Sequence, residues 1–115
     1  MSEPKSQDQR RSARVSVQLT VLVRTELADG KRIQIQAFTQ EINAHGGLLE
    51  SPVRLSRNQK ITLVSLQAGK EISCRVVQAE GIGGASFGIA FEFDQPDPHF
   101  WPIAVPPGDW VHSEA

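Results

Sequence analysis

The sequence predicts an all-β fold of six short strands, arranged as a barrel or a sandwich. Apolar and polar residues alternate with the two-residue period of half-buried strands, and turn-forming residues separate the alternating runs. No helical periodicity lasts longer than a turn or two, so little helix is expected. With 115 residues, of which 39% are hydrophobic, the chain can bury one modest core. We therefore expect a single domain with tails.

The clearest predicted element is the strand that begins at Val15. Its odd-numbered residues up to Val23 are all apolar, and most of the residues between them are polar, as in a strand with one buried face. Asp29-Gly30 is typical of a hairpin turn, and a second alternating run follows over residues 33–37. The two runs are expected to pair antiparallel.

Beyond Ala37 the apolar residues change phase to Phe38 and Ile42, which predicts a bulge or a strong coil where the sheet bends to close. Gly46-Gly47 is then expected to break the strand, before a short return strand over Leu48–Ser51. The glycine-rich residues 81–85 are expected to form a hairpin loop. The remaining predicted strands span Ile61–Leu66, Glu71–Ala79 and Phe87–Phe93.

The two ends of the chain differ from the region between them. Residues 1–9 are too polar to join a core and are expected to form a mobile tail, whereas residues 10–93 are expected to form the β domain. In residues 94–115 five prolines exclude regular strand or helix, yet Phe100, Trp101 and Trp110 are too apolar for a solvated tail. This Pro/aromatic extension is interpreted as a cover over the open end of the barrel in preference to a docking peptide for a partner.

The charge composition argues against several classes of partner. Lys and Arg total 12 and Asp and Glu total 13, so the net charge of −1 gives no bulk electrostatic reason to bind a nucleic acid polymer or an anionic membrane. No apolar run approaches the length of a membrane span, and the single cysteine, Cys74, allows no intrachain disulfide. We expect a soluble cytoplasmic protein with no membrane insertion.

The sequence gives little support for catalysis or for a metal. His45, His99, His112 and Cys74 lack close metal-ligand spacing, and Cys74 lies in an alternating strand, where a core thiol is expected. Residues 81–85 are followed by neither a lysine nor a helix, so they do not form a phosphate loop. No serine nucleophile motif and no paired acids indicate an active site. We expect no enzyme activity, no metal site and no cofactor.

Three arginines, Arg10, Arg11 and Arg14, lie directly before the first predicted strand. A guanidinium can donate two parallel hydrogen bonds to a phosphodiester, and its planar face can stack on a base. The other interpretation is a solubilising cationic tail, because short basic clusters are common at chain termini. This segment alone leaves both interpretations open.

A second polar segment lies at the end of the second long strand. Glu41 and Asn43 are two residues apart, so their side chains project from the same face and offer oxygen acceptors side by side. Such a pair suits the N1–H and N2–H₂ edge of guanine, and Gly46 and Gly47 allow a close backbone approach. The other interpretation is an ordinary polar strand end followed by a glycine turn.

Together the two segments resemble the paired signature motifs of the PilZ domain family, Arg-x-x-x-Arg followed by Asp/Asn-x-Ser-x-x-Gly. Residues 10–14 match the first motif in full. Residues 41–46 match the second in spacing and in its glycine, with Glu41 in place of Asp and Asn43 in place of Ser. The resemblance covers roughly residues 10–93 and implies a six-stranded antiparallel β-barrel.

PilZ domains bind cyclic di-GMP, so the resemblance implies a nucleotide site. By this resemblance the three arginines would clamp the phosphates and stack on the guanines of an intercalated cyclic di-GMP dimer, while the second motif would cup a guanine on the barrel surface. The ligand-binding residues implied in this way are Arg10, Arg11, Arg14, Glu41, Asn43 and Gly46.

Three functional hypotheses follow. The leading one is a sensor or adaptor module in which cyclic di-GMP, as a regulatory ligand, orders the arginine segment and changes the surface shown to a protein partner of unknown identity. The second is a PilZ-like protein–protein interaction module that no longer binds nucleotide, which the departures at Glu41 and Asn43 favour. The third, a barrel that binds a nucleic acid polymer, is opposed by the near-zero charge and by the shortage of exposed aromatics on the predicted strands.

Overall fold

A computed structural model describes residues 13–103 and 107 of the chain. The tail of residues 1–9, Arg10, Arg11 and Trp110 lie outside the described residues, so the expectations placed on them stay untested. The described residues contain strands and loops but no helix. The strands are β1 (Val15–Ser16), β2 (Thr20–Glu26), β3 (Arg32–Asn43), β4 (Gly46–Ser51), β5 (Lys60–Ser65), β6 (Lys70–Gly81) and β7 (Phe87–Phe93).

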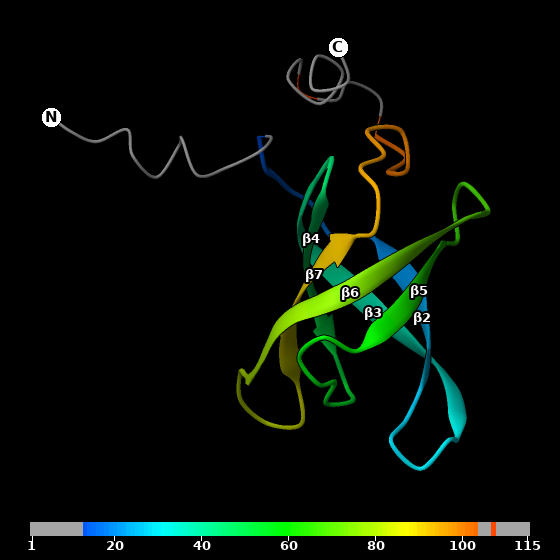
Figure 1. Cartoon of the computed structure of the whole chain (residues 1–115). Coiled ribbons are helices and arrows are strands. Elements are labelled where there is room, and N and C mark those ends of the chain that lie inside the picture. Colours follow the sequence, from blue (N-terminus) through cyan, green and yellow to red (C-terminus); the bar gives the residue numbers. More distant parts are fainter. Residues whose placement is uncertain (1–12, 104–106, 108–115) are drawn as a thin grey trace, which may run out of the picture.

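Six of these strands form a closed barrel. The order around it is β3-β2-β5-β6-β7-β4, and β4 pairs with β3 to close the ring. All of these pairings are antiparallel. The short β1 is added to the edge of β3 that β2 also uses. The predicted six-stranded antiparallel barrel is therefore confirmed, and Figure 1 shows its strands crossing around a shared interior.

The barrel interior is filled by alternate side chains of its strands. On β2, Val23 and Thr25 are buried while Arg24 between them is exposed, because successive side chains of a strand point to opposite faces. Full burial of one such apolar side chain contributes about 1.5–3 kcal/mol, so the core supplies most of the stabilisation. The core residues of the strands include Val21, Val23, Ala37, Ile42, Leu49, Ile61, Leu63, Cys74, Val76, Ile89, Phe91 and Phe93.

The run from Val15 to Val23, expected to be one strand, is divided into β1 and β2. Residues 17–19 between them make no regular strand, although both strands pair with β3. The buried side chain of Thr39 on β3 bridges this break: its Oγ1 accepts a hydrogen bond from the Leu19 amide at 2.8 Å and donates one to the Val17 carbonyl at 2.6 Å. A threonine hydroxyl thus replaces part of the missing backbone ladder.

The bend predicted in the second long strand is present, but not with the predicted phase. The pairing of β3 with β4 shifts register between Thr39 and Glu41, so a bulge lies there as expected. Thr39 is buried and Ile42 is buried beyond the bulge, whereas Phe38, expected to face inward, is 36% exposed. The prediction for Phe38 was wrong because the neighbouring Thr39 points inward, where its hydroxyl bonds the backbone of Leu19 and Val17.

The Pro/aromatic extension continues the core after β7. Phe100 and Trp101 are buried, and their rings lie 5.0 Å apart in an edge-on arrangement. Trp101 also contacts Phe91 and Phe93 of β7, with centroid distances of 6.2 and 5.8 Å. In Figure 1 the extension follows β7 at one end of the barrel. The described part of the extension therefore packs on the barrel.

Candidate functional site

A cavity of about 360 Å³ lies on the outer surface of the barrel, where β3, β4, β6 and β7 meet the residues before β1. Its lining includes Arg14, Glu41, Asn43 and Gly46. These are four of the six residues that the sequence implied, and they come from two segments well separated along the chain. Arg10 and Arg11 lie outside the described residues.

Arg14 reaches the site because β1 pairs with the end of β3. Val15 is the partner of Ile42 and Ser16 the partner of Glu41, so the preceding residue lies beside the second motif. The Arg14 Nη1 lies 3.4 Å from Glu41 Oε1, and the two side chains are 49% and 38% exposed. Ion pairs this exposed contribute little, roughly 0–1 kcal/mol. Both groups can therefore exchange this contact for a ligand at low cost.

Asn43 is committed to the turn that joins β3 and β4. Its Oδ1 accepts a hydrogen bond from the His45 amide at 2.7 Å, and its backbone carbonyl accepts one from the Trp101 indole Nε1–H at 2.8 Å. An Asn side chain that bonds the backbone two residues on is a common turn device. Its amide NH₂ makes no hydrogen bond to another described residue, so Asn43 offers a ligand donors more readily than acceptors.

Gly46 of the second motif and the following Gly47 start β4 and do not break the strand as expected; the turn is formed by Ala44 and His45 before them. A Cβ on Gly46 would overlap the Phe91 carbonyl oxygen, and one on Gly47 would overlap the Glu41 carbonyl oxygen. Close packing of β4 between its neighbours therefore requires both glycines. Gly46 is needed by the barrel whether or not a ligand is bound.

The floor of the cavity is apolar and was not predicted. Cross-strand pairing places Leu48 of β4 between Glu41 of β3 and Ala90 of β7. Val77, 37% exposed, joins the lining from β6, where the pairing with β7 shifts register between Val76 and Gln78. A bulge changes the direction in which a side chain points, and here it brings Val77 into the cavity lining. The cavity lining thus combines the apolar side chains of Leu48, Val77 and Ala90, called its floor here, with polar groups.

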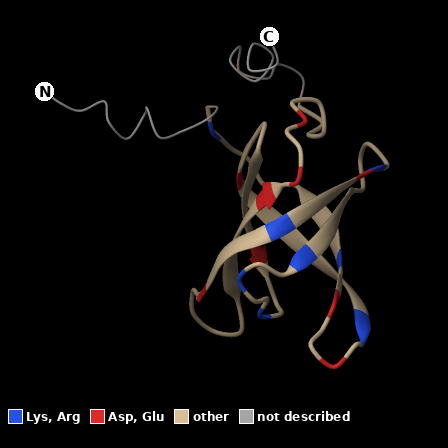
Figure 2. Ribbon diagram, in the orientation of Figure 1, with Lys and Arg blue, Asp and Glu red and all other residues tan. Residues whose placement is uncertain are grey.

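Glu92 adds a second carboxylate to the lining. Its Oε1 accepts a hydrogen bond from Arg75 Nη2 at 2.8 Å, and its side chain is only 23% exposed. The strand alternation of residues 87–93 could have shown that Glu92 points outward, but not that β7 lies beside β4. Figure 2 shows acidic and basic positions interspersed over the barrel.

Comparison with known proteins identifies the fold. No protein-family model matches the chain, and no curated protein matches its sequence. A search of solved structures finds the PilZ domain with c-di-GMP of YcgR from Escherichia coli, with a TM-score of 0.56 and 17% sequence identity. The match covers 76% of this chain and 79% of that chain. The fold is PilZ-like.

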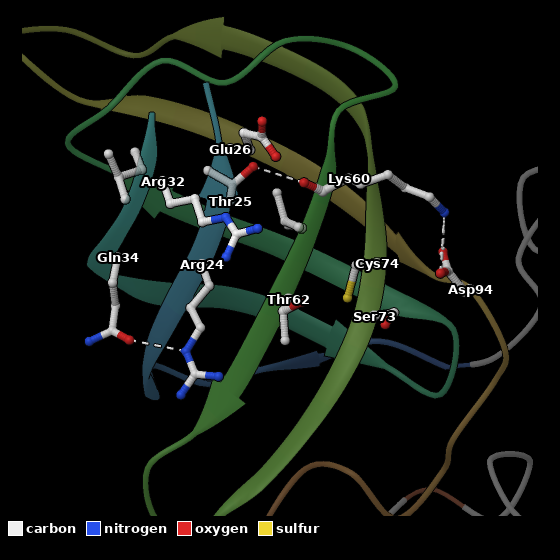
Figure 3. A pocket seen from close by; sticks show the side chains of 12 residues that line it. Arg24, Thr25, Glu26, Arg32, Gln34, Lys60, Thr62, Ser73, Cys74 and Asp94 are labelled. Carbon is white, nitrogen blue, oxygen red and sulfur yellow. Dashed lines mark hydrogen bonds and ion pairs between the residues drawn. The ribbon is translucent and has the colours of Figure 1, made fainter. Parts of the chain in front are cut away.

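A second cavity, of about 540 Å³, lies on the PilZ-like barrel over β2, β3, β5 and β6. Two of its three cations have anionic partners: Arg24 lies 3.0 Å from Glu71 and also bonds Gln34 at 3.1 Å, and Lys60 lies 3.1 Å from Asp94. Figure 3 shows the contacts of Arg24 with Gln34 and of Lys60 with Asp94. None of its lining residues belongs to the two motifs named from the sequence, so the cavity at Arg14 is the candidate site.

The single cysteine, Cys74, is part of the barrel core. The Cys74 side chain is fully buried, and burial, with a smaller contribution from the Asp94 carboxylate, raises the pKa of its thiol to about 12. The thiolate needed for nucleophilic attack or metal binding is therefore suppressed at neutral pH.

Among the described residues no group of three His, Cys, Asp or Glu side chains could hold a metal ion. Within the same residues, no helix has the length and apolar character of a membrane span.

Proposed function

We propose that this PilZ-like barrel is a cyclic di-GMP-binding sensor or adaptor module, with no catalytic activity of its own, that changes its contacts with a partner protein in the cytoplasm. One observation carries the proposal: Arg14 and the second motif, 27 or more residues away in sequence, line one cavity. The fold is also similar to that of the PilZ domain with c-di-GMP of YcgR.

The cavity offers the chemistry that a guanine nucleotide needs. A guanine ring can lie on the apolar floor of Leu48, Val77 and Ala90, and its N1–H and N2–H₂ edge can reach the Glu41 carboxylate at the rim. Arg14 can leave Glu41 and donate a bidentate pair of hydrogen bonds to a phosphate. By the family resemblance, Arg10 and Arg11 would add further contacts to the phosphates and guanines.

Isothermal titration calorimetry with cyclic di-GMP tests the proposal, and cyclic di-AMP and GMP are the ligand controls. Hydrogen bonds to charged groups contribute about 1.5–3 kcal/mol. Arg14→Ala should therefore weaken binding by about one to two decades without changing the unfolding midpoint.

Arg32→Ala is the matched control, because Arg32 is an exposed arginine at the opposite end of β3. It should leave the affinity unchanged. If the folded parent protein gives no heat with cyclic di-GMP, the sensor function is wrong and the protein–protein interaction module replaces it. If cyclic di-AMP binds as well as cyclic di-GMP, the assignment of a guanine site is wrong.

A further inference from the structure

Three consecutive carbonyl groups of the β3–β4 turn accept hydrogen bonds from the C-terminal part of the chain. The Asn43 carbonyl accepts from Trp101 Nε1–H at 2.8 Å, and the Ala44 carbonyl accepts from the Asp97 amide at 3.0 Å. The His45 carbonyl accepts from the Phe93 amide at 2.7 Å. The turn that carries the second motif is therefore held from one side by residues 93–101.

The bond from Trp101 is the one made by a side chain, and it lies in the core. Trp101 is 3% exposed and packs against Phe91, Phe93 and Phe100. A buried indole N–H needs a partner, because an unsatisfied buried donor loses its bond to water without compensation. The indole and the Asn43 carbonyl are thus tied together as long as the aromatic cluster stays packed.

The same turn supplies part of the wall of the candidate site. Asn43 and His45 both line the cavity, and the Asn43 side chain bonds the His45 amide. Phe91, which contacts Trp101, lines it as well. The position of these groups relative to Arg14 and Glu41 therefore depends on how residues 93–101 dock on the barrel.

We infer that Trp101 is a positioning residue for the nucleotide site, and that occupancy of the site and docking of residues 94–103 are coupled. This inference rests on the proposed cyclic di-GMP function and deepens it, because it names the element that responds to the ligand. Trp101 does not touch the ligand; it fixes the turn that does. Coupling between binding free energies is reciprocal, so a ligand that favours the formed turn must also favour the docked segment.

The first test compares Trp101→Phe with Phe100→Leu. Trp101→Phe keeps an aromatic ring in the cluster but removes the N–H donor, whereas Phe100→Leu keeps an apolar side chain in the cluster and leaves the Trp101 donor and its bond to Asn43 in place. With both variants folded, calorimetry should show Trp101→Phe weakening cyclic di-GMP binding by about two- to tenfold, the worth of one net hydrogen bond. Phe100→Leu should change the affinity by less than about twofold, because its loss falls on stability.

The second test uses the unaltered chain, so it does not depend on a variant folding. Hydrogen exchange of the Asp97 and Phe93 amides is measured with and without cyclic di-GMP, at a concentration that saturates the parent protein but not Arg14→Ala, which is the control that should respond less. The inference expects slower exchange at both amides in the parent protein, since bound ligand stabilises the docked state.

Each outcome decides a different claim. Measurable binding with unchanged exchange at Asp97 and Phe93, or with equal affinities for the parent and Trp101→Phe, overturns this inference and leaves the proposed function standing. No binding by the parent protein overturns the proposed function and, with it, the coupling. Slower exchange in the parent protein together with weaker binding by Trp101→Phe supports both.

Discussion

At the scale of single residues, Glu41 has two roles that oppose each other. Its carboxylate can accept hydrogen bonds from guanine, yet in the free protein it lies 3.4 Å from Arg14 Nη1 and thus competes with phosphate for that guanidinium. Where the PilZ motif has Asp, the longer Glu reaches one methylene further. Glu41, one of the two side chains that depart from the second motif, is therefore the one that pairs with Arg14 of the first motif.

Restoring the motif with Glu41→Asp and Asn43→Ser should tighten cyclic di-GMP binding, by up to about fivefold if the loss of one exposed ion pair decides the effect. Calorimetry at fixed salt measures it. Glu41→Gln separates the causes: it keeps the side-chain length and removes the competing charge. Tightening in both variants indicates competition for Arg14, and tightening only with Asp indicates acceptor geometry. A restored variant that binds no better than the parent contradicts this account of Glu41.

The residues of the candidate site divide by how they could be found. Arg14, Glu41, Asn43 and Gly46 were named from the sequence because spacing within each motif is local information. The floor residues could not be named, because they become neighbours only through the pairing of β4 with β7 and through a bulge. Trp101 was recognised as too apolar for solvent, but its bond to the Asn43 carbonyl is a contact across 58 residues of sequence.

At the scale of elements, alternation predicted the last strand and the first hairpin but not the break within the run from Val15 to Val23. The last strand, Phe87–Phe93, has the predicted bounds, and the β2–β3 hairpin forms at Asp29-Gly30. Alternation failed where a polar side chain takes an inward position. Thr39 does so because its hydroxyl bonds Leu19 and Val17, and no periodicity in apolar residues can show that.

Thr39→Val tests the bridging role of that hydroxyl. Valine has nearly the same shape but leaves the Leu19 amide and the Val17 carbonyl without a partner, so the free energy of unfolding should fall by about 1–3 kcal/mol. Urea denaturation measures the loss, and hydrogen exchange at Leu19 should become faster. Thr39→Ser keeps the hydroxyl and should lose only about 0.8 kcal/mol for the missing carbon. If the valine variant is as stable as the serine variant, the hydroxyl does not hold the break between β1 and β2.

At the scale of the whole molecule, the barrel and the extension share one core. Phe100 and Trp101 close an aromatic cluster that β7 begins, and the same segment holds the turn of the candidate site. A small domain has few residues to spare for its core, so two buried aromatic rings are a large share of its stabilisation. The extension therefore contributes to stability and to the shape of the site together.

Deletion of residues 95–115 should destabilise the domain strongly. It removes Phe100 and Trp101, whose burial contributes about 1.5–3 kcal/mol each, and a loss of about 3–6 kcal/mol is large against a total of 5–15 kcal/mol. It also exposes Phe91 and Phe93, so solubility should fall. Thermal melting and the soluble yield measure both effects. A second truncation that lacks only residues 104–115 isolates what residues 95–103 contribute. If the longer deletion keeps the melting temperature and solubility of the parent but abolishes binding to a partner, the segment is a docking peptide and its packing on the barrel is incidental to stability.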